Sequence, residues 1–262
     1  MFGRNVIEKP VFLAAKNGAL SVQEIFYTIQ GEGPYAGMPA VFIRLAGCNL
    51  RCHFCDTDFE SQARPWTQRD IVNEVQRLLP EPTRAHLRPL IVLTGGEPCR
   101  QPIGALLVEL VDQLGYRVQI ETAGTLWPRA MEERHLLRGD VVLVCSPKTK
   151  QVHDDIERYC RDWKYIISAR DEHHPLTGLP TSSTQVKGES STLFVPPWNK
   201  RPGDTIWVQP CAEYYEIDLL DRVASPRVDV DETMRNVNLC AELAMKFGYR
   251  VSLQTHKIMG LP

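Results

Sequence analysis

Short apolar runs, each followed at once by small or polar residues, recur along this 262-residue chain. Most are rich in Val, Ile and Leu and lack the alternation of polar residues that marks a strand with one solvated face. Near-continuous runs of this kind are typical of strands buried on both faces, as in a parallel sheet. We therefore expect strands at 40–47, 90–94, 116–124, 141–145, 163–168, 205–210 and 250–257.

Patterns typical of amphipathic helices lie between these runs. Apolar residues over 103–114 follow helical spacing and stop at Gly115. A second helix is expected after Thr67 as its N-cap, and a last one runs from Asp231 as its cap to Gly248. Alternating strands and helices indicate βαβ units, hence the α/β class. Because about seven strands are fewer than the roughly eight of a closed TIM-type barrel, we predict an incomplete barrel of mostly parallel strands.

Composition and charge narrow the class of protein. Hydrophobic residues make up 43% and charged residues 24% of the chain, as in an ordinary globular domain. We expect a single domain over 1–262, with an insertion at about 169–204 that is rich in Pro, Ser, Thr and Gly. The net charge of −2 and the absence of a basic run argue against a nucleic-acid partner. No secretory signal or membrane span is recognisable, so we expect a cytoplasmic protein that does not bind membranes.

Three cysteines, Cys48, Cys52 and Cys55, lie in "GCNLRCHFCDTDF", directly after a predicted strand. Clustered thiolates bind zinc or iron–sulfur clusters. A zinc site with His53 as fourth ligand is awkward, because His53 directly follows Cys52 and structural zinc ligands usually come in two separated pairs. A 4Fe–4S cluster held by three thiolates would leave one iron free for a chelating ligand such as S-adenosylmethionine. We expect the other cysteines to be buried apolar residues, namely Cys99, Cys145, Cys160, Cys211 and Cys240.

The motifs "CNLRCHFC" and "TGGEP" resemble those of radical S-adenosylmethionine enzymes. The longer stretches "EIFYTIQGEGPYAGMPAVFIRLAGCNLRCHFCDTDF", "SPK", "VQP" and "LQTHKIMGLP" are similar to one family among them, the 7-carboxy-7-deazaguanine synthases. The resemblance runs from Glu24 to Pro262 and leaves out about 150–204. It implies a lyase with a radical S-adenosylmethionine core that converts 6-carboxy-5,6,7,8-tetrahydropterin to 7-carboxy-7-deazaguanine with loss of ammonia, a step toward queuosine or other 7-deazapurines.

The resemblance also implies cofactors and partners. The cofactors would be a 4Fe–4S cluster, S-adenosylmethionine and Mg²⁺. The substrate would be a small pterin, an external donor such as flavodoxin would supply the electron, and the chain would form a homodimer. Because the radical comes from the cofactor, the resemblance assigns no catalytic residue of the protein.

Individual positions are assigned through the same resemblance. Cys48, Cys52 and Cys55 would ligate the cluster, and Thr57 would ligate Mg²⁺. The residues expected to bind S-adenosylmethionine are Phe54, Cys55, Asp56, Gly96, Glu121, Ser146, Pro147, Lys148 and Gln209. The residues expected to bind the substrate are Ile29, Gln30, Gly31, Arg44, Thr94 and Pro262.

Two of these positions carry a specific argument. Arg44 lies in an otherwise apolar predicted strand, where an unpaired cation would be costly. A guanidinium can bind a carboxylate through two hydrogen bonds, and the resemblance pairs Arg44 with the carboxylate of the substrate. The family usually reads Glu-Thr-Asn-Gly where this chain has Ala123, so the contribution of that Asn is missing or supplied elsewhere.

Alternative functions remain open from the residues alone. One is a different radical enzyme, such as a glycyl-radical activase, which "YTIQGEG" and the terminal "QTHK" argue against. The other is a non-enzymatic zinc or redox-sensing module. His256 and Lys257 are expected to anchor the tail or the mouth of the site, and His173 and His174 to lie in an exposed loop.

Overall fold

The computed structural model describes residues 18–81, 88–128, 130–185, 192–195, 203–213 and 228–262. Their strands form one sheet in the order β3-β1-β2-β4-β5-β6-β7-β8-β9. From β2 to β9 every pairing is parallel, whereas β1 pairs antiparallel with both β2 and β3. Because β3 and β9 end the order without pairing with each other, the barrel is open, as predicted. The strands are β1 (Leu20–Ile29), β2 (Pro39–Leu45), β3 (Arg64–Trp66), β4 (Leu90–Gly95), β5 (Arg117–Thr122), β6 (Val141–Cys145), β7 (Asp162–Ile167), β8 (Thr205–Pro210) and β9 (Arg250–Val251).

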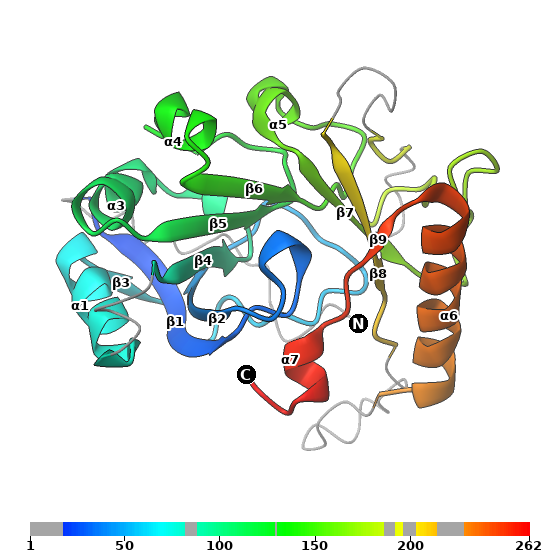
Figure 1. The fold of residues 1–262 in the computed structure, drawn as a ribbon, viewed down its shortest axis with the longest axis horizontal. Helices are drawn as coiled ribbons and strands as arrows, with labels where there is room; N and C mark the ends of the chain where they lie inside the picture. Colours follow the sequence, from blue (N-terminus) through cyan, green and yellow to red (C-terminus); the bar gives the residue numbers. More distant parts are fainter. Residues whose placement is uncertain (1–17, 82–87, 129, 186–191, 196–202, 214–227) are drawn as a thin grey trace.

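Helices lie around the outside of the curved sheet, and α7 lies on its open side (Figure 1). The longest is α6, whose apolar stripe packs against β7, β8 and β9. The short 3-10 turns η1 (Gly33–Tyr35) and η2 (Pro98–Arg100) follow β1 and β4. The helices are α1 (Gln68–Leu78), α3 (Gly104–Leu107), α4 (Glu133–Leu137), α5 (Asp154–Tyr159), α6 (Val230–Phe247) and α7 (Thr255–Ile258), with a π-helical segment η3 (Val108–Gln113).

Helix ends follow the predicted signals in one case and differ in another. Thr67 caps α1 as predicted, and with Asp70 it forms a reciprocal capping box. The predicted cap of α6 was wrong, because Asp229 rather than Asp231 accepts a hydrogen bond from the backbone N–H of Glu232, at 3.1 Å. The helix therefore begins earlier than expected, and it ends at Gly248 with φ of 75°, as the glycine predicted.

The last predicted strand, 250–257, was too long. Only Arg250–Val251 form β9, and the chain then turns into α7. The polar residues of this run explain the turn, because Ser252 and Gln254 place their side chains in a polar network on the concave face instead of extending the sheet. The prediction also omitted β1 and β3, which form the antiparallel edge of the sheet.

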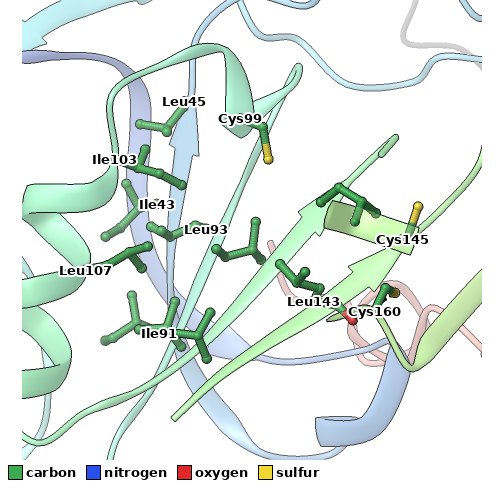
Figure 2. Close-up of a cluster of buried hydrophobic side chains, with 14 of the residues drawn as sticks. Ile43, Leu45, Ile91, Leu93, Cys99, Ile103, Leu107, Leu143, Cys145 and Cys160 are labelled. Carbon is green, nitrogen blue, oxygen red and sulfur yellow. Dashed lines mark hydrogen bonds between the residues drawn. The ribbon is translucent and has the colours of Figure 1, made fainter. Parts of the chain in front are cut away.

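The convex face of the sheet carries the main core. Alternate residues of β2 and β4 point toward α3 and meet its apolar side chains there (Figure 2). Cys99, Cys145 and Cys160 belong to this cluster, and Cys211 and Cys240 are buried as well, so the prediction that these five cysteines are buried is confirmed. The residues between, on the opposite face, are the ones that build the site.

Among the described residues, no helix combines the length and the apolar character needed to cross a membrane.

Candidate active site

Polar side chains gather on the concave face of the sheet. Thr94 of β4 follows Val92 by two residues, and Glu121 of β5 follows Gln119 by two, while Val92 and Gln119 are register partners. Because side chains two residues apart share a face of a strand, these polar groups all point to the same side. Lys164, on β7, is buried on the same side and reaches Glu32 there. The strand pattern thus lines one face with groups that can bind a polar ligand.

Glu121 is the centre of the first polar cluster. Its Oε1 accepts hydrogen bonds from Gln30 Nε2 and Gln119 Nε2, both at 3.0 Å. Its Oε2 accepts from Thr94 Oγ1 at 3.1 Å. Gln30 and Thr94 are predicted substrate residues and Glu121 is a predicted cofactor residue, so the two predicted sets meet here.

Glu32 is the centre of the second cluster. Lys164 Nζ bonds Glu32 Oε2, and Gln254 Nε2 and Gln209 Nε2 donate to Glu32 Oε1 at 2.9 and 3.2 Å. Burial acts to raise the pKa of Glu32, but the charge and hydrogen bond of Lys164 prevail and lower it to about 2. The predicted cofactor residue Gln209 therefore lies within a paired, buried charge network.

The cysteine loop, 46–63, connects β2 to β3 and is fastened at its base. Gly47 N donates to Phe59 O at 3.1 Å, and Gly47 O accepts from Glu97 N at 2.9 Å. Arg100 Nη1 donates to Cys48 O at 2.6 Å. A Cβ added at Gly96 would come within 2.3 Å of Gly47 O, so only glycine allows the "TGGEP" turn to approach this loop so closely.

The three loop cysteines differ from the others in exposure. Cys48, Cys52 and Cys55 are half-buried, whereas the five remaining cysteines are buried. Burial raises the pKa of the Cys48 thiol to about 12 and raises that of Cys55, so these thiols must lose protons to the solvent when iron binds. Soft sulfur donors at the carboxyl ends of the strands fit an iron–sulfur cluster. Within the described ranges, no three His, Cys, Asp or Glu side chains converge as ligands of one metal ion.

The "SPK" turn after β6 faces the same loop. Lys148 Nζ lies 5.6 Å from the ring centre of Phe54, and it bonds Ser146 Oγ. Ser146 N donates to Thr122 O at 2.8 Å, which fixes the turn against the end of β5. Four predicted residues for S-adenosylmethionine, Phe54 and the "SPK" trio, are thus brought together.

The two aspartates of the "CDTDF" segment make different contacts. Asp58 Oδ1 accepts from the backbone N–H groups of Glu60 and Ser61, both at 3.0 Å, so it stabilises its own turn. Asp56 instead bonds Lys257 Nζ of α7 at 2.8 Å, and Thr57 Oγ1 lies 3.4 Å from Asp56 Oδ1. The predicted Mg²⁺ ligand Thr57 therefore stands beside the carboxylate of Asp56, whose other oxygen is paired with Lys257.

The C-terminal residues contact the end of β1 and the loop that follows it. Pro262 O accepts a hydrogen bond from Thr28 Oγ1 at 3.0 Å, next to the predicted substrate residue Ile29. A Cβ added at Gly31 would lie 2.2 Å from His256 Nδ1, so Gly31 packs directly under the His256 ring. These contacts join three predicted positions, Gly31, His256 and Pro262, to the region around the end of β1, as expected if His256 anchors the tail.

Arg44 has a partner within the protein. Arg44 Nε donates to Glu24 Oε1 at 2.7 Å across the β1–β2 pair, where the two residues are in register. This ion pair explains how a strand that is otherwise apolar tolerates a guanidinium. If Arg44 also binds the carboxylate of the substrate, as predicted, its guanidinium would bind that carboxylate and Glu24 at the same time.

Several residues of this site were not predicted. The largest omissions are Glu32 and Lys164, followed by Gln119 and Gln254. For Lys164 and Gln119 a signal was present in the sequence, since both are isolated polar residues inside apolar runs and fall on the same strand face as Glu121. Ala123, where the family has Asn, donates its backbone N–H to Glu97 Oε2 at 2.8 Å, a contact that needs no side chain.

Comparison with known proteins defines the class. The family model described as the Radical SAM superfamily matches residues 42–143, which include the cysteine loop and the "TGGEP" turn. The crystal structure of QueE from Escherichia coli shares the fold, with a TM-score of 0.57 and 21% identity over 90% of this chain and 93% of that chain. The fold and the cysteine loop thus define a radical S-adenosylmethionine enzyme.

Relatives of full length identify the family. The 7-carboxy-7-deazaguanine synthase of Rhodospirillum rubrum is 42% identical over 260 residues, covering 99% of each chain. That of Rickettsia prowazekii is 35% identical over 268 residues, covering 100% of this chain and 96% of the relative. The chain belongs to the 7-carboxy-7-deazaguanine synthase family. Its cofactors are therefore a 4Fe–4S cluster, S-adenosylmethionine and Mg²⁺.

Proposed function

We propose that this chain converts 6-carboxy-5,6,7,8-tetrahydropterin to 7-carboxy-7-deazaguanine with loss of ammonia, as a step in queuosine or 7-deazapurine biosynthesis. The observation that carries the proposal is the meeting of three half-buried cysteines, the "SPK" turn and a polar concave face at one mouth. The full-length identity to synthases of this name supports it.

The bound cluster and S-adenosylmethionine would supply a 5′-deoxyadenosyl radical that removes the hydrogen at C6 of the substrate. The chain's own work is binding and orientation. Cys48, Cys52 and Cys55 would hold the iron. Gln30 and Thr94 would face the pterin edge, and both bond Glu121, which would bind S-adenosylmethionine.

The tail completes this arrangement. Pro262 O accepts a hydrogen bond from Thr28 Oγ1 of β1, next to Ile29, so the tail would lie beside the bound substrate. A tail in that place would limit the access of water and stray hydrogen donors to a radical, which is the protection that this chemistry needs.

A turnover assay tests the proposal. Protein reconstituted anaerobically with iron and sulfide is incubated with S-adenosylmethionine, a reductant, Mg²⁺ and the carboxypterin. We expect mass spectrometry to detect the deazaguanine acid with wild-type protein and at least a hundredfold less with Cys52→Ala.

The matched control is Cys240→Ala, which removes a cysteine from α6 rather than from the loop. It should keep both iron and product formation. Wild-type protein that holds zinc without iron, or Cys52→Ala protein that still turns over, would refute the proposal.

Two partners belong to the same proposal. An external donor such as flavodoxin would reduce the cluster, and the chain would act as a homodimer. Exposed apolar side chains on one face of α6, Val230, Met234 and Met245, support an association surface, because such residues rarely line up on a solvated helix.

A further inference from the structure

Residues 183–185 of the insertion lie between the cysteine loop and the "SPK" turn. An isolated antiparallel bridge joins Gln185 to Cys52, and His53 N donates to Thr184 O at 3.0 Å. On the other side, Thr184 N and Ser183 Oγ both donate to Lys148 O at 3.0 Å. This segment, which we term the clasp, therefore connects two parts of the candidate active site.

Both clasp side chains beside Cys52 direct a donor at its sulfur. Thr184 Oγ1 lies 3.1 Å from Cys52 Sγ, and Gln185 Nε2 lies 3.5 Å from the same atom. The Thr184 hydroxyl also lies 3.3 Å from Lys148 O, but a thiolate ligand carries negative charge, which a neutral carbonyl oxygen lacks, and competes better for the single proton.

The orientation of the Gln185 amide is fixed by a second contact. Gln185 Oε1 accepts a hydrogen bond from Arg51 N at 2.8 Å. An amide nitrogen could not accept this bond, so the NH₂ group must be the end that faces the sulfur. Cys48 Sγ, in comparison, accepts from the backbone N–H of Leu50 at 3.4 Å.

The described parts of the insertion on either side of the clasp are held by further hydrogen bonds. Leu193 N donates to Thr181 O and Phe194 N to Thr149 O, both at 3.0 Å. Tyr165 OH, from β7, donates to Phe194 O at 2.9 Å. The backbone of the insertion is thus tied to β7 and to the "SPK" turn, and the donors at Cys52 are preorganised.

We propose that Thr184 and Gln185 are positioning residues that raise the reduction potential of the 4Fe–4S cluster by donating hydrogen bonds to the Cys52 thiolate. The added electron places more negative charge on the cluster sulfurs, and hydrogen bonds to those sulfurs stabilise the reduced state. The inference rests on the proposed function, because it requires the cluster to be ligated by Cys52. It gives the insertion a part in the electron transfer that starts each turnover.

The test is a redox titration of the anaerobically reconstituted holoenzyme, followed by electron paramagnetic resonance of the reduced cluster. Thr184→Val keeps the shape of the side chain and removes the donor, and Gln185→Leu removes the other. We expect a more negative midpoint potential in each variant and a larger shift in the double variant. A tenfold fall in the ratio of reduced to oxidised cluster at a fixed donor potential corresponds to ~59 mV for one electron.

Two further variants separate donation from packing. Thr184→Ser restores a hydroxyl and should return the potential to the wild-type value. Ser183→Ala loses the bond to Lys148 O and the bond that Ser183 Oγ accepts from Gln185 N, but none to sulfur, so its potential should stay at the wild-type value.

Three results would overturn the inference. The first is a wild-type midpoint potential in both Thr184→Val and Gln185→Leu. The second is a shift in Ser183→Ala as large as the shift in those two variants. The third is a loss of iron in Thr184→Val that also occurs in Thr184→Ser. Iron and sulfide analysis distinguishes this failure from that of the proposed function. Wild-type protein without iron refutes both, whereas wild-type protein with a full cluster and unshifted variants refutes the clasp alone.

Discussion

Some charged side chains of this site are buried, and the ion pair of Glu32 with Lys164 is the clearest case. The folded pKa of Glu32, about 2, lies below its ordinary value of 4.5. The pair therefore contributes stability that is present above the unfolded pKa and is lost as the pH falls toward the folded value. Both side chains are at most 10% exposed, so solvent screens the pair little.

Lys164→Met should reverse this pH dependence. Without its cation the buried carboxylate would have a folded pKa above its unfolded value, so the variant would lose stability as the pH rises from about 4 to 7. Removing one partner of a buried pair costs about 3–5 kcal/mol. Urea denaturation at both pH values measures the effect, and Glu32→Gln combined with Lys164→Met should recover part of the loss at neutral pH. A pH-independent loss would count against this account.

At the residue scale, sequence reasoning predicted motif positions, which stay predictions, and missed the internal partners that the structure shows. The cysteines, Gly96 and the "SPK" residues follow strand ends, a place that a linear pattern reveals. The ion pair of Glu32 with Lys164 could not be predicted, because the two residues are distant in sequence and only the closing sheet brings them together. The Thr184 and Gln185 contacts with Cys52 depend on the path of the insertion, which has no periodic pattern to predict it.

At the scale of elements, the parallel strands were predictable because their apolar runs are nearly continuous. β1 was not among the predicted strands because polar residues such as Glu24 and Thr28 interrupt it on the concave side. β9 was overestimated because an edge strand has one neighbour, and the polar residues after Val251 gain more from the network around Glu32. Strand existence thus follows from burial, whereas strand length at an edge depends on tertiary partners.

The exposed stripe of α6 leads to a prediction about association. Val230, Met234 and Met245 are 62%, 48% and 80% exposed, and their spacing places them within one face of the helix. If this face is the dimer surface, Met234→Lys combined with Met245→Lys should shift the protein to monomers in light scattering. Leu137→Lys is the matched control, since Leu137 is 74% exposed on α4 and should leave the mass unchanged. A wild-type monomer would refute the homodimer.

At the scale of the whole molecule, the described chain is joined by contacts between its ends. The tail reaches Thr28 of β1, Lys257 of α7 reaches Asp56, and Gln254 reaches Glu32. The open sheet is therefore bridged across its concave side by residues that follow β9. The single domain stays a prediction, and it requires such bridging, because the site draws residues from both halves of the sheet.

A single domain should unfold as one unit, which urea denaturation of the cluster-free protein can test. Trp66 of β3 lies near one end of the sheet, and Trp163 and Trp207 lie in β7 and β8 toward the other. Tryptophan fluorescence, far-ultraviolet circular dichroism and the labelling of the five buried thiols should therefore change over the same urea range. Labelling of the α6 thiol Cys240 at lower urea than the fluorescence change would mean that α6 separates first, and the chain would then have two cooperative units.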